Sequence, residues 1–269
     1  MVKKSFSFAF KQKISSGIVL LLLLFFALNS TLTLAFFYDD EWGSNVVGLS
    51  GKVVIEAVGK GDHGVSLDTE GNFDSIEDTI DSSNLIITLG DGYQTLVPGM
   101  DVFIDANCKV YASTTSPLLR AKIEFLFVDN DSNEIGETNQ VLADMQGRIA
   151  EVIRSNNWVQ YTAPGETQAY WYYLGDVSQT GIADTANKIM KEVDVTSGDD
   201  IVDFIDEPIE FPTYVDSSYS GFRCIVKITF QAIQNYIPDA DGHKLANTIT
   251  NSQQIFKFFD TGERPPFGD

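Results

Sequence analysis

The sequence has few of the residues on which metal enzymes and cysteine-rich domains depend. Its 269 residues include only two cysteines and two histidines. Two thiols are too few for a disulfide-stapled small domain or for a zinc cluster built from thiolates. His63 and His243 are far apart, and neither begins an H-E-x-x-H helix. No G-x-S-x-G elbow is present either. We therefore predict no catalytic residue, no metal site and no cofactor.

Positive charge is also scarce. Lys and Arg number 18 against 38 Asp and Glu, which gives a formal net charge of −20 at pH 7. Such a surface repels phosphate backbones and anionic headgroups, so binding to nucleic acid or to a membrane surface is not expected. Hydrophobic residues make up 43% of the chain and aromatic residues 12%, enough to bury a sizeable core. The composition indicates a folded acidic protein of one domain or two small ones.

The first 35 residues have the profile of a signal peptide. Residues 1–13 carry only basic charge, and an uncharged apolar run follows at 14–26. Cleavage is expected between Ala35 and Phe36. Because the removed part holds four lysines and no acid, the secreted chain would carry a charge of −24. In this interpretation the chain meets the membrane only through the uncleaved signal; the alternative is that the run persists as an anchor.

Strict alternation of apolar and polar residues dominates the exported part. Turn-forming pairs such as Pro98-Gly99 and Pro164-Gly165 separate the alternating segments. Many strands without βαβ alternation predict a mainly β fold at 51–260, an antiparallel jelly-roll or immunoglobulin-like β-sandwich with a helical insertion. The segments expected to be strands are 52–58, 84–89, 102–110, 120–128 and 222–232.

One segment, 139–155, follows a helical period instead. Its apolar residues recur at steps of three and four, which predicts an amphipathic helix with one buried stripe. Residues 182–192 are a weaker helical candidate without such a stripe, and 261–269 are expected to form a flexible tail. The predicted stripe consists of Val141, Leu142, Met145, Ile149, Val152 and Ile153.

Three smaller features each leave two readings. Cys108 and Cys224 lie on apolar faces of expected strands, so they are either a disulfide between the sheets or free core thiols. The aromatic run 170–173 could stack on carbohydrate, but alternation places rings on both faces and favours core packing. The acidic segment 129–134 resembles the start of an EF-hand loop, yet Glu134 stands where glycine is needed, so a solvated turn is favoured.

Several short motifs occur in a characteristic order along the chain. They are Thr33-Leu34-Ala35, Phe36-Phe37-Tyr38-Asp39-Asp40-Glu41, Gly51-Lys52-Val53-Val54-Ile55, Leu96-Val97-Pro98-Gly99-Met100-Asp101, Tyr170-Trp171-Tyr172-Tyr173-Leu174-Gly175 and Ile228-Thr229-Phe230-Gln231-Ala232-Ile233-Gln234. Together they resemble the TasA and camelysin family, although segments 129–158 and 176–213 diverge and the family pattern does not explain the cysteines. The resemblance implies a jelly-roll-like β-sandwich, cleavage of the leader by a SipW-type signal peptidase, and a role as a secreted subunit of biofilm-matrix fibres.

The segment after the cleavage site is suited to strand donation, the assembly mode that the resemblance implies. An extended chain would place Phe36, Tyr38, Asp40 and Trp42 on one face. Burying three aromatic side chains at ~1.5–3 kcal/mol each would contribute on the order of 5–9 kcal/mol before ordering costs. We predict that 36–50 forms a donor-strand segment that binds a second copy of the chain. The binding residues expected are Phe36, Phe37, Tyr38, Trp42, Val46 and Val47.

Two other functions stay open at this stage. Camelysin-like relatives suggest a cell-surface metallopeptidase, for which the two histidines offer little support. A non-polymerising adhesion protein, or an accessory subunit of fibres made by another protein, would need no free donor segment. The interpretation favoured by the sequence is a secreted homopolymeric fibre subunit that acts structurally and not as an enzyme.

Overall fold

The computed structural model describes residues 53–61, 65–71, 80–89, 97–129, 131, 133–134, 140–175, 184–215, 222–235 and 245–261. All of them belong to one compact unit, Gly51–Asp269. The predicted signal peptide and the predicted donor segment 36–50 lie outside the described residues. Among those that are described, no helix is both long enough and apolar enough to cross a membrane.

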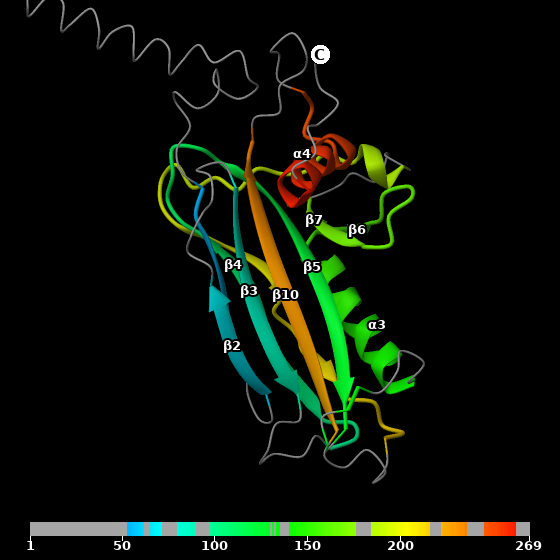
Figure 1. Cartoon of the computed structure of the whole chain (residues 1–269). Coiled ribbons are helices and arrows are strands. Elements are labelled where there is room, and N and C mark those ends of the chain that lie inside the picture. The colour runs from blue at the N-terminus through cyan, green and yellow to red at the C-terminus, as the bar shows by residue number, and fades with distance from the viewer. Residues whose placement is uncertain are drawn as a thin grey trace, which may run out of the picture. The chain divides into compact units, whose positions relative to one another are not determined.

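The described chain is mainly β and forms two antiparallel sheets (Figure 1), which confirms that part of the prediction. The smaller sheet has the order β1-β4-β8, and β9 pairs with the beginning of β4. The larger sheet has the order β2-β3-β10-β5-β7-β6. The strands are β1 (Ile55–Gly61), β2 (Val65–Gly71), β3 (Ile80–Leu89), β4 (Asp101–Val110), β5 (Pro117–Val128), β6 (Trp158–Tyr161), β7 (Tyr170–Tyr173), β8 (Asp200–Ile205), β9 (Pro208–Glu210) and β10 (Arg223–Gln234).

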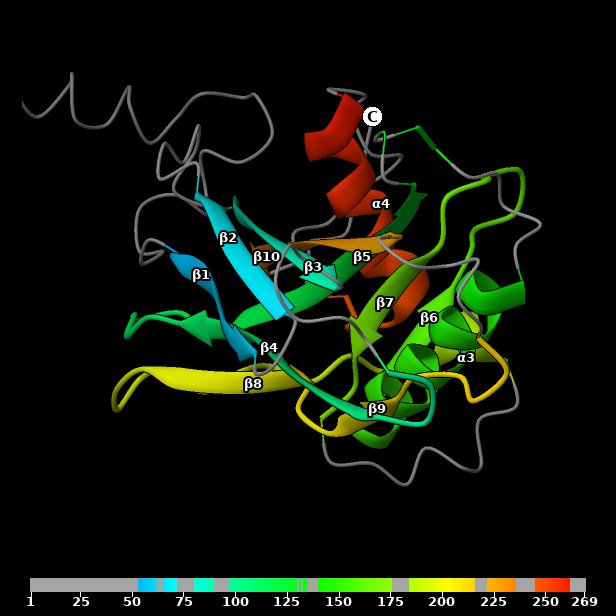
Figure 2. The ribbon, with the colours of Figure 1, turned by 90° about the horizontal axis from the view of Figure 1, so that it is seen from below.

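Alternate side chains of both sheets meet in one hydrophobic core, which Figure 2 shows as the space between two layers. From the small sheet, Ile104 and Cys108 of β4 are fully buried; from the large sheet, so are Ile87 of β3 and Phe230 of β10. This pattern follows from the strand period of two, which sends every second side chain to the same face. The core therefore uses the apolar positions that the alternation indicated.

Helix α3 (Gln140–Ser155) lies at the predicted helical insertion and buries the whole predicted stripe. It contacts β5 and β6 of the large sheet and β8 and β9 of the small one. In Figure 2 it lies at the side of the two layers, where the sheets diverge. The helix thus covers an opening that the strands alone leave in the core.

Helix α4 (Ile249–Thr261) is a second helix, which the sequence reasoning missed. The Thr248 hydroxyl accepts a hydrogen bond from the backbone N–H of Asn251 at 3.2 Å, a capping interaction at the start of the helix. Its buried face contains Ile249, Ser252 and Phe256. The serine interrupts the apolar pattern, which explains why this stripe is less conspicuous than that of α3.

The weaker helical prediction, 182–192, was wrong for the part that the structure describes. Only a 3₁₀ turn, η1 (Thr185–Asn187), forms there, and the side chain of Asp184 accepts a hydrogen bond from the N–H of Ala186 at its start. Lys188 is already extended, and Ile189 then forms a β-bridge with Thr248. Without an apolar stripe the segment has no helical face to bury.

The expected tail begins inside α4, whose last residue is Thr261; the remainder, 262–269, lies outside the described residues.

Candidate binding site beside strand β5

Strand β5 is paired along its whole length on one side but only in part on the other. Strand β10 pairs with β5 from Pro117 to Val128. On the opposite side, β7 pairs only with Arg120 and Ala121, and Glu134 bridges Val128. Within the described ranges, no strand pairs with this side of Lys122–Leu126. That stretch presents main-chain donors and acceptors to which a further strand could bind.

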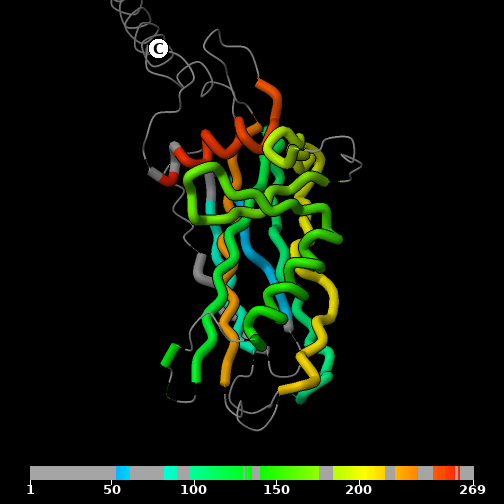
Figure 3. Tube along the Cα trace, turned by 90° about the vertical axis from the view of Figure 1, so that its right-hand side faces the viewer, coloured from blue at the N-terminus to red at the C-terminus, as the bar shows by residue number. Residues whose placement is uncertain are grey.

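The direction of the β6–β7 hairpin explains why the edge is left open. Each of its strands has four residues, and the hairpin runs across the end of the large sheet instead of along β5 (Figure 3, light green). It therefore shares only two residue pairs with β5 before the chains separate. The opening arises from the lengths and angle of neighbouring strands and not from any unusual residue in β5 itself.

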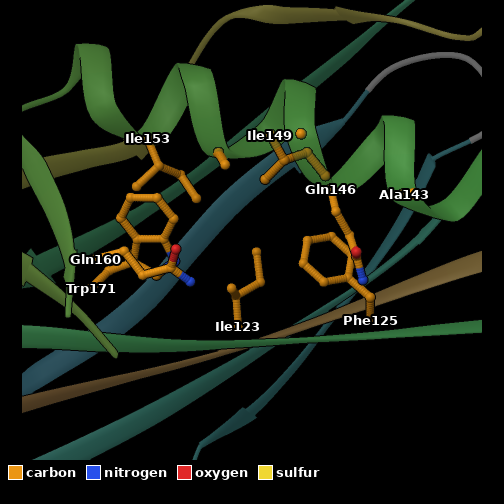
Figure 4. Close-up of a pocket in the computed structure, with 10 residues that line it drawn as sticks. Ile123, Phe125, Ala143, Gln146, Ile149, Ile153, Gln160 and Trp171 are labelled. Carbon is orange, nitrogen blue, oxygen red and sulfur yellow. The ribbon is translucent and has the colours of Figure 1, made fainter. Parts of the chain in front are cut away.

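An uncharged cavity of about 440 Å³ lies between the open part of β5 and helix α3 (Figure 4). Ile123 and Phe125 of β5 project into it, and Trp171 of β7 and Gln160 of β6 close one end. This volume is within the range of about 300–1,000 Å³ typical of pockets that hold small ligands. None of the residues that line it is charged; the α3 residues among them are Ala143, Gln146, Gly147, Ile149, Ala150 and Ile153.

Small residues keep this face of α3 open. Ala143, Gly147 and Ala150 follow one another at helical spacing and all line the cavity. A Cβ atom added at Gly147 would meet no other atom within 4 Å. Gly147 is exposed, so this space is open to solvent, and a larger side chain at this position would extend over the mouth of the cavity.

Three polar side chains lie in the cavity wall. Trp171 is 2% exposed, and its indole N–H has no hydrogen-bond partner among the described residues. The Gln160 amide lies beside Trp171, and the Gln146 amide lies beside Phe125 (Figure 4). A buried indole N–H without an acceptor is costly, because a lost hydrogen bond is not replaced by water. The wall thus offers donors and acceptors to an occupant that is mostly apolar.

Basic residues flank the cavity in an otherwise acidic molecule. The guanidinium of Arg154 lies 5.7 Å from the centroid of the Trp171 ring. Arg148 forms an ion pair with Glu210 at 3.0 Å. Lys122, on the open stretch of β5, forms one with Glu124 at 2.8 Å. These positive charges make the electrostatic potential around the cavity less negative than over the rest of the surface.

The other end of β5 carries a buried charge. In the alternation of β5, Arg120 falls on the side of the polar residues Lys122 and Glu124, yet it is only 1% exposed, because α4 covers that face. Its guanidinium stacks on the rings of Tyr170 and Phe256, at 3.9 Å and 4.3 Å from their centroids. It donates to Gln231 Oε1 at 2.6 Å and pairs with the carboxylate of Asp260. This cluster attaches α4 to the sheet.

The aromatic run 170–173 packs inside the protein on both of its faces. Trp171 faces the cavity, whereas Tyr172 is fully buried beneath α4. Burial raises the pKa of the Tyr172 hydroxyl to about 12, so it stays protonated at every physiological pH. Tyr170 and Tyr173 are partly exposed. The arrangement agrees with the core-packing interpretation of this run.

Both cysteines are buried free thiols. Cys108 belongs to β4 of the small sheet and Cys224 to β10 of the large sheet. Of the two alternatives that the sequence left open, the structure has the unbonded one. Burial raises the pKa of the Cys224 thiol to about 12, which leaves it protonated and unreactive at neutral pH.

Most of the other residues singled out by the sequence lie outside the described residues. Ala35, His63 and His243 lie outside the described residues, as do the six residues predicted to bind in strand donation: Phe36, Phe37, Tyr38, Trp42, Val46 and Val47. In the acidic segment, the Asp129 carboxylate accepts the backbone N–H groups of Asp131 and Asn133, both at 2.9 Å, as in a local turn. No three His, Cys, Asp or Glu side chains within the described ranges are grouped so that they could hold a metal ion.

Comparisons with known proteins provide no further assignment. No family model matches the chain, no curated protein matches it, and no solved structure matches it. The geometry of the β5 edge and of the cavity is therefore the basis for a functional proposal.

Proposed function

We propose that the chain is a secreted structural subunit of an extracellular fibre, in which the segment after the cleaved leader adds as a strand to the next subunit. The observation that supports this most is the open stretch Lys122–Leu126 of β5. One side of this stretch pairs with β10, and the other side has no partner strand among the described residues. In this proposal the two sheets form the jelly-roll-like β-sandwich of the family that the sequence resembles.

The chain that precedes the first described residue is long enough to reach a neighbour. Residues 36–52 separate the expected cleavage site from Val53. Extended at roughly 3.3 Å per residue, they would span on the order of 55 Å. Each molecule would then offer one strand and one open edge. Such contacts do not close on themselves, so they generate filaments.

The leader would control the timing of assembly. Before cleavage, the apolar run 14–26 would hold the adjoining segment at the membrane. Cleavage after Ala35 by a SipW-type peptidase would release it outside the cell. The resulting charge of −24 would keep fibres soluble and limit lateral clumping. The fibre would therefore form in the extracellular matrix or at the cell surface, with the chain itself as principal partner and an accessory subunit as a further one.

Electron microscopy and sedimentation of two purified chains test the proposal. One begins at Phe36, and the other lacks 36–42. The first should form filaments, whereas the second should stay monomeric with an unchanged circular dichroism spectrum. Filaments of equal number and length from both chains would contradict strand donation. A folded chain beginning at Phe36 that never assembles would instead favour the adhesion or accessory role.

A further inference from the structure

We infer that the cavity beneath α3 is the receiving site for the aromatic side chains Phe36 and Tyr38 of a second copy of this chain. The inference depends on the proposed function and specifies which surface the donated strand enters. It commits to one occupant, residues 36–42 of a neighbouring molecule. The argument joins the open backbone edge, the side-chain space beside it, and the charges around both.

The open edge and the cavity are aligned. Ile123 and Phe125 belong to the unpaired stretch of β5, and both point into the cavity (Figure 4). In a β-ladder, directly opposed residues project to the same face of the sheet. A strand paired with Lys122–Leu126 would therefore place the residues opposite Ile123 and Phe125 in the cavity. The backbone edge and the apolar space act as one site.

The lining selects which donor residues enter. Two positions of the incoming strand face the cavity, and no charged residue lines it. Phe36 and Tyr38 are two residues apart and both aromatic, whereas the next residue on that face is Asp40. An unpaired carboxylate would be costly in an apolar cavity. Phe36 and Tyr38 are therefore the adjacent pair in this segment that suits the two positions, and Asp40 would lie beyond the cavity.

Trp171 indicates the direction of the strand. Its indole N–H lacks a partner among the described residues, and Ala121, opposite Trp171 in the ladder, lies next to Ile123 on the cavity face. Of the two aromatic residues, only Tyr38 carries an oxygen that can accept this bond. An antiparallel strand with Tyr38 opposite Ile123 and Phe36 opposite Phe125 would bring that oxygen to the Trp171 end. Because Trp171 already pairs with Ala121, the donor chain would leave the edge of β5 at Asp40.

Charge favours this edge over the edge formed by β8. Strand β8 carries Asp200 and Asp203, and Asp206 follows it. Partial burial and the carboxylates of Asp206, Asp105 and Asp200 raise the pKa of Asp203, which indicates a strongly negative local field. A donor with three consecutive acids at 39–41 would be repelled there. Beside β5, Asp39 would meet Lys122, which is paired with Glu124, so the local field on that outer face is less negative than at β8.

Filling the cavity tests the inference without removing the donor. At Gly147 an added Cβ meets no atom within 4 Å, and Gly147→Leu replaces glycine by a better helix former, so the Tm of the folded chain should not fall below that of wild type. The matched control is Glu151→Leu, on an exposed position of α3 that does not line the cavity. Starting from Phe36, the Gly147→Leu chain should assemble at least tenfold more slowly than wild type, whereas the control should match wild type.

Cross-linking identifies the occupant directly. Gly147→Cys is combined with Phe36→Cys or Tyr38→Cys, and in parallel with Phe37→Cys or Asp39→Cys, and the chains are oxidised during assembly. Covalent ladders should form with Phe36→Cys and Tyr38→Cys. Phe37→Cys and Asp39→Cys, and the control Glu151→Cys in place of Gly147→Cys, should give at least fivefold less. The native cysteines are buried and add little background.

The outcomes separate the two proposals. Filaments from Gly147→Leu at the wild-type rate, without cross-links from 147, would overturn the cavity assignment while leaving strand donation at another edge intact; the cavity would then hold a small apolar molecule or nothing. Cross-links from positions 37 or 39 in place of 36 and 38 would show that the opposite face of the donor strand enters the cavity. No assembly and no cross-links from the wild-type chain would overturn both proposals together.

Discussion

The guanidinium of Arg120 and the carboxylate of Asp260 form an ion pair that joins the centre of the large sheet to helix α4. Arg120 is 1% exposed, whereas the side chain of Asp260 remains 29% exposed. Gln231 of β10 bonds to both partners, accepting from Arg120 Nε and donating to Asp260 Oδ1 at 3.2 Å. Arg120 is therefore fully removed from water and Asp260 is not. Leaving Arg120 without its partner should thus cost more folding free energy than leaving Asp260 without its own.

Removing Asp260 should cost more than removing both partners. Asp260→Ala leaves a buried guanidinium without its counter-charge, and we expect a loss of about 2–4 kcal/mol in the free energy of unfolding. Arg120→Met combined with Asp260→Ala removes the buried charge as well and should recover part of that loss. Urea unfolding of Arg120→Met, of Asp260→Ala and of the double variant measures the interaction energy between the two residues in a double-mutant cycle. Strictly additive losses would show that the two residues do not interact.

Asp260→Asn is the control for this cycle. The amide oxygen keeps an acceptor for Arg120 but removes the negative charge. Its loss of stability should lie between those of wild type and Asp260→Ala. A loss equal to that of Asp260→Ala would assign the whole effect to charge.

The spacing of apolar residues was sufficient to predict elements, such as α3 and β4, in which one face alone carries the apolar residues and is buried. The buried residues of α3 are the six that the three-and-four spacing indicated, and β4 buries the alternate positions from Val102 to Val110. In both cases a single face meets one continuous core, so the sequence pattern and the burial pattern coincide. The mainly antiparallel β class followed from the same signal.

The remaining features depend on contacts that periodicity does not encode. Arg120 occupies a polar position of its strand, but α4, more than a hundred residues later in the chain, covers it. Similarly, the open stretch of β5 exists because β7 pairs with only two of its residues. The sequence predicted neither the lengths of β6 and β7 nor the angle of their hairpin. Gly147 offered a partial signal, since glycine inside a predicted helix suggests a packing or functional reason.

A buried asparagine fixes the junction of β4 and β8. Asn107 is 8% exposed, and its Oδ1 accepts the backbone N–H of Phe204 at 3.0 Å where the register of the two strands shifts. Asn107→Ala would leave that N–H without an acceptor, at a cost of about 1–3 kcal/mol. For a domain of this size we expect Tm to fall by about 2–10 °C.

Asp105→Ala is the matched control for the asparagine. The Asp105 carboxylate accepts from Asn107 Nδ2 at 2.6 Å, but its loss leaves the Phe204 N–H bonded. Its bond is nearer the surface, so the fall in Tm should be smaller than that of Asn107→Ala. Equal changes in the two variants would contradict the role given to Phe204.

Gly147→Ala should stabilise the folded chain. The added Cβ meets no atom within 4 Å, and alanine is favoured over glycine inside a helix by about 1 kcal/mol. We expect Tm to rise by about 2–4 °C, with filament assembly unchanged because a methyl group leaves most of the cavity empty. Differential scanning calorimetry measures the rise. A fall in Tm would show that the backbone at Gly147 requires glycine.

Asp203 should destabilise the fold at neutral pH. Its pKa is raised by partial loss of hydration and then by the carboxylates of Asp206, Asp105 and Asp200. A carboxyl whose folded pKa lies above its unfolded value lowers stability at high pH, and this penalty disappears as pH falls through the folded pKa toward the unfolded one. Asp203→Asn should therefore raise Tm at pH 7. The gain should be small, about 1–2 °C, because the side chain is exposed.

Asp199 provides the opposite case and the control. The backbone N–H of Ala112 and the ammonium group of Lys109 bind its carboxylate and lower its pKa. Its contribution to stability is present above the unfolded pKa and is lost as pH falls through the folded pKa. Asp199→Asn should therefore lower Tm at pH 7. The effect of Asp203→Asn should disappear as pH falls to the ordinary pKa of an aspartate, whereas that of Asp199→Asn should persist to lower pH. Tm measured from pH 3 to 8 for both variants checks the signs; a fall in Tm at pH 7 for Asp203→Asn would show that its carboxylate is bound by a partner that compensates the repulsion.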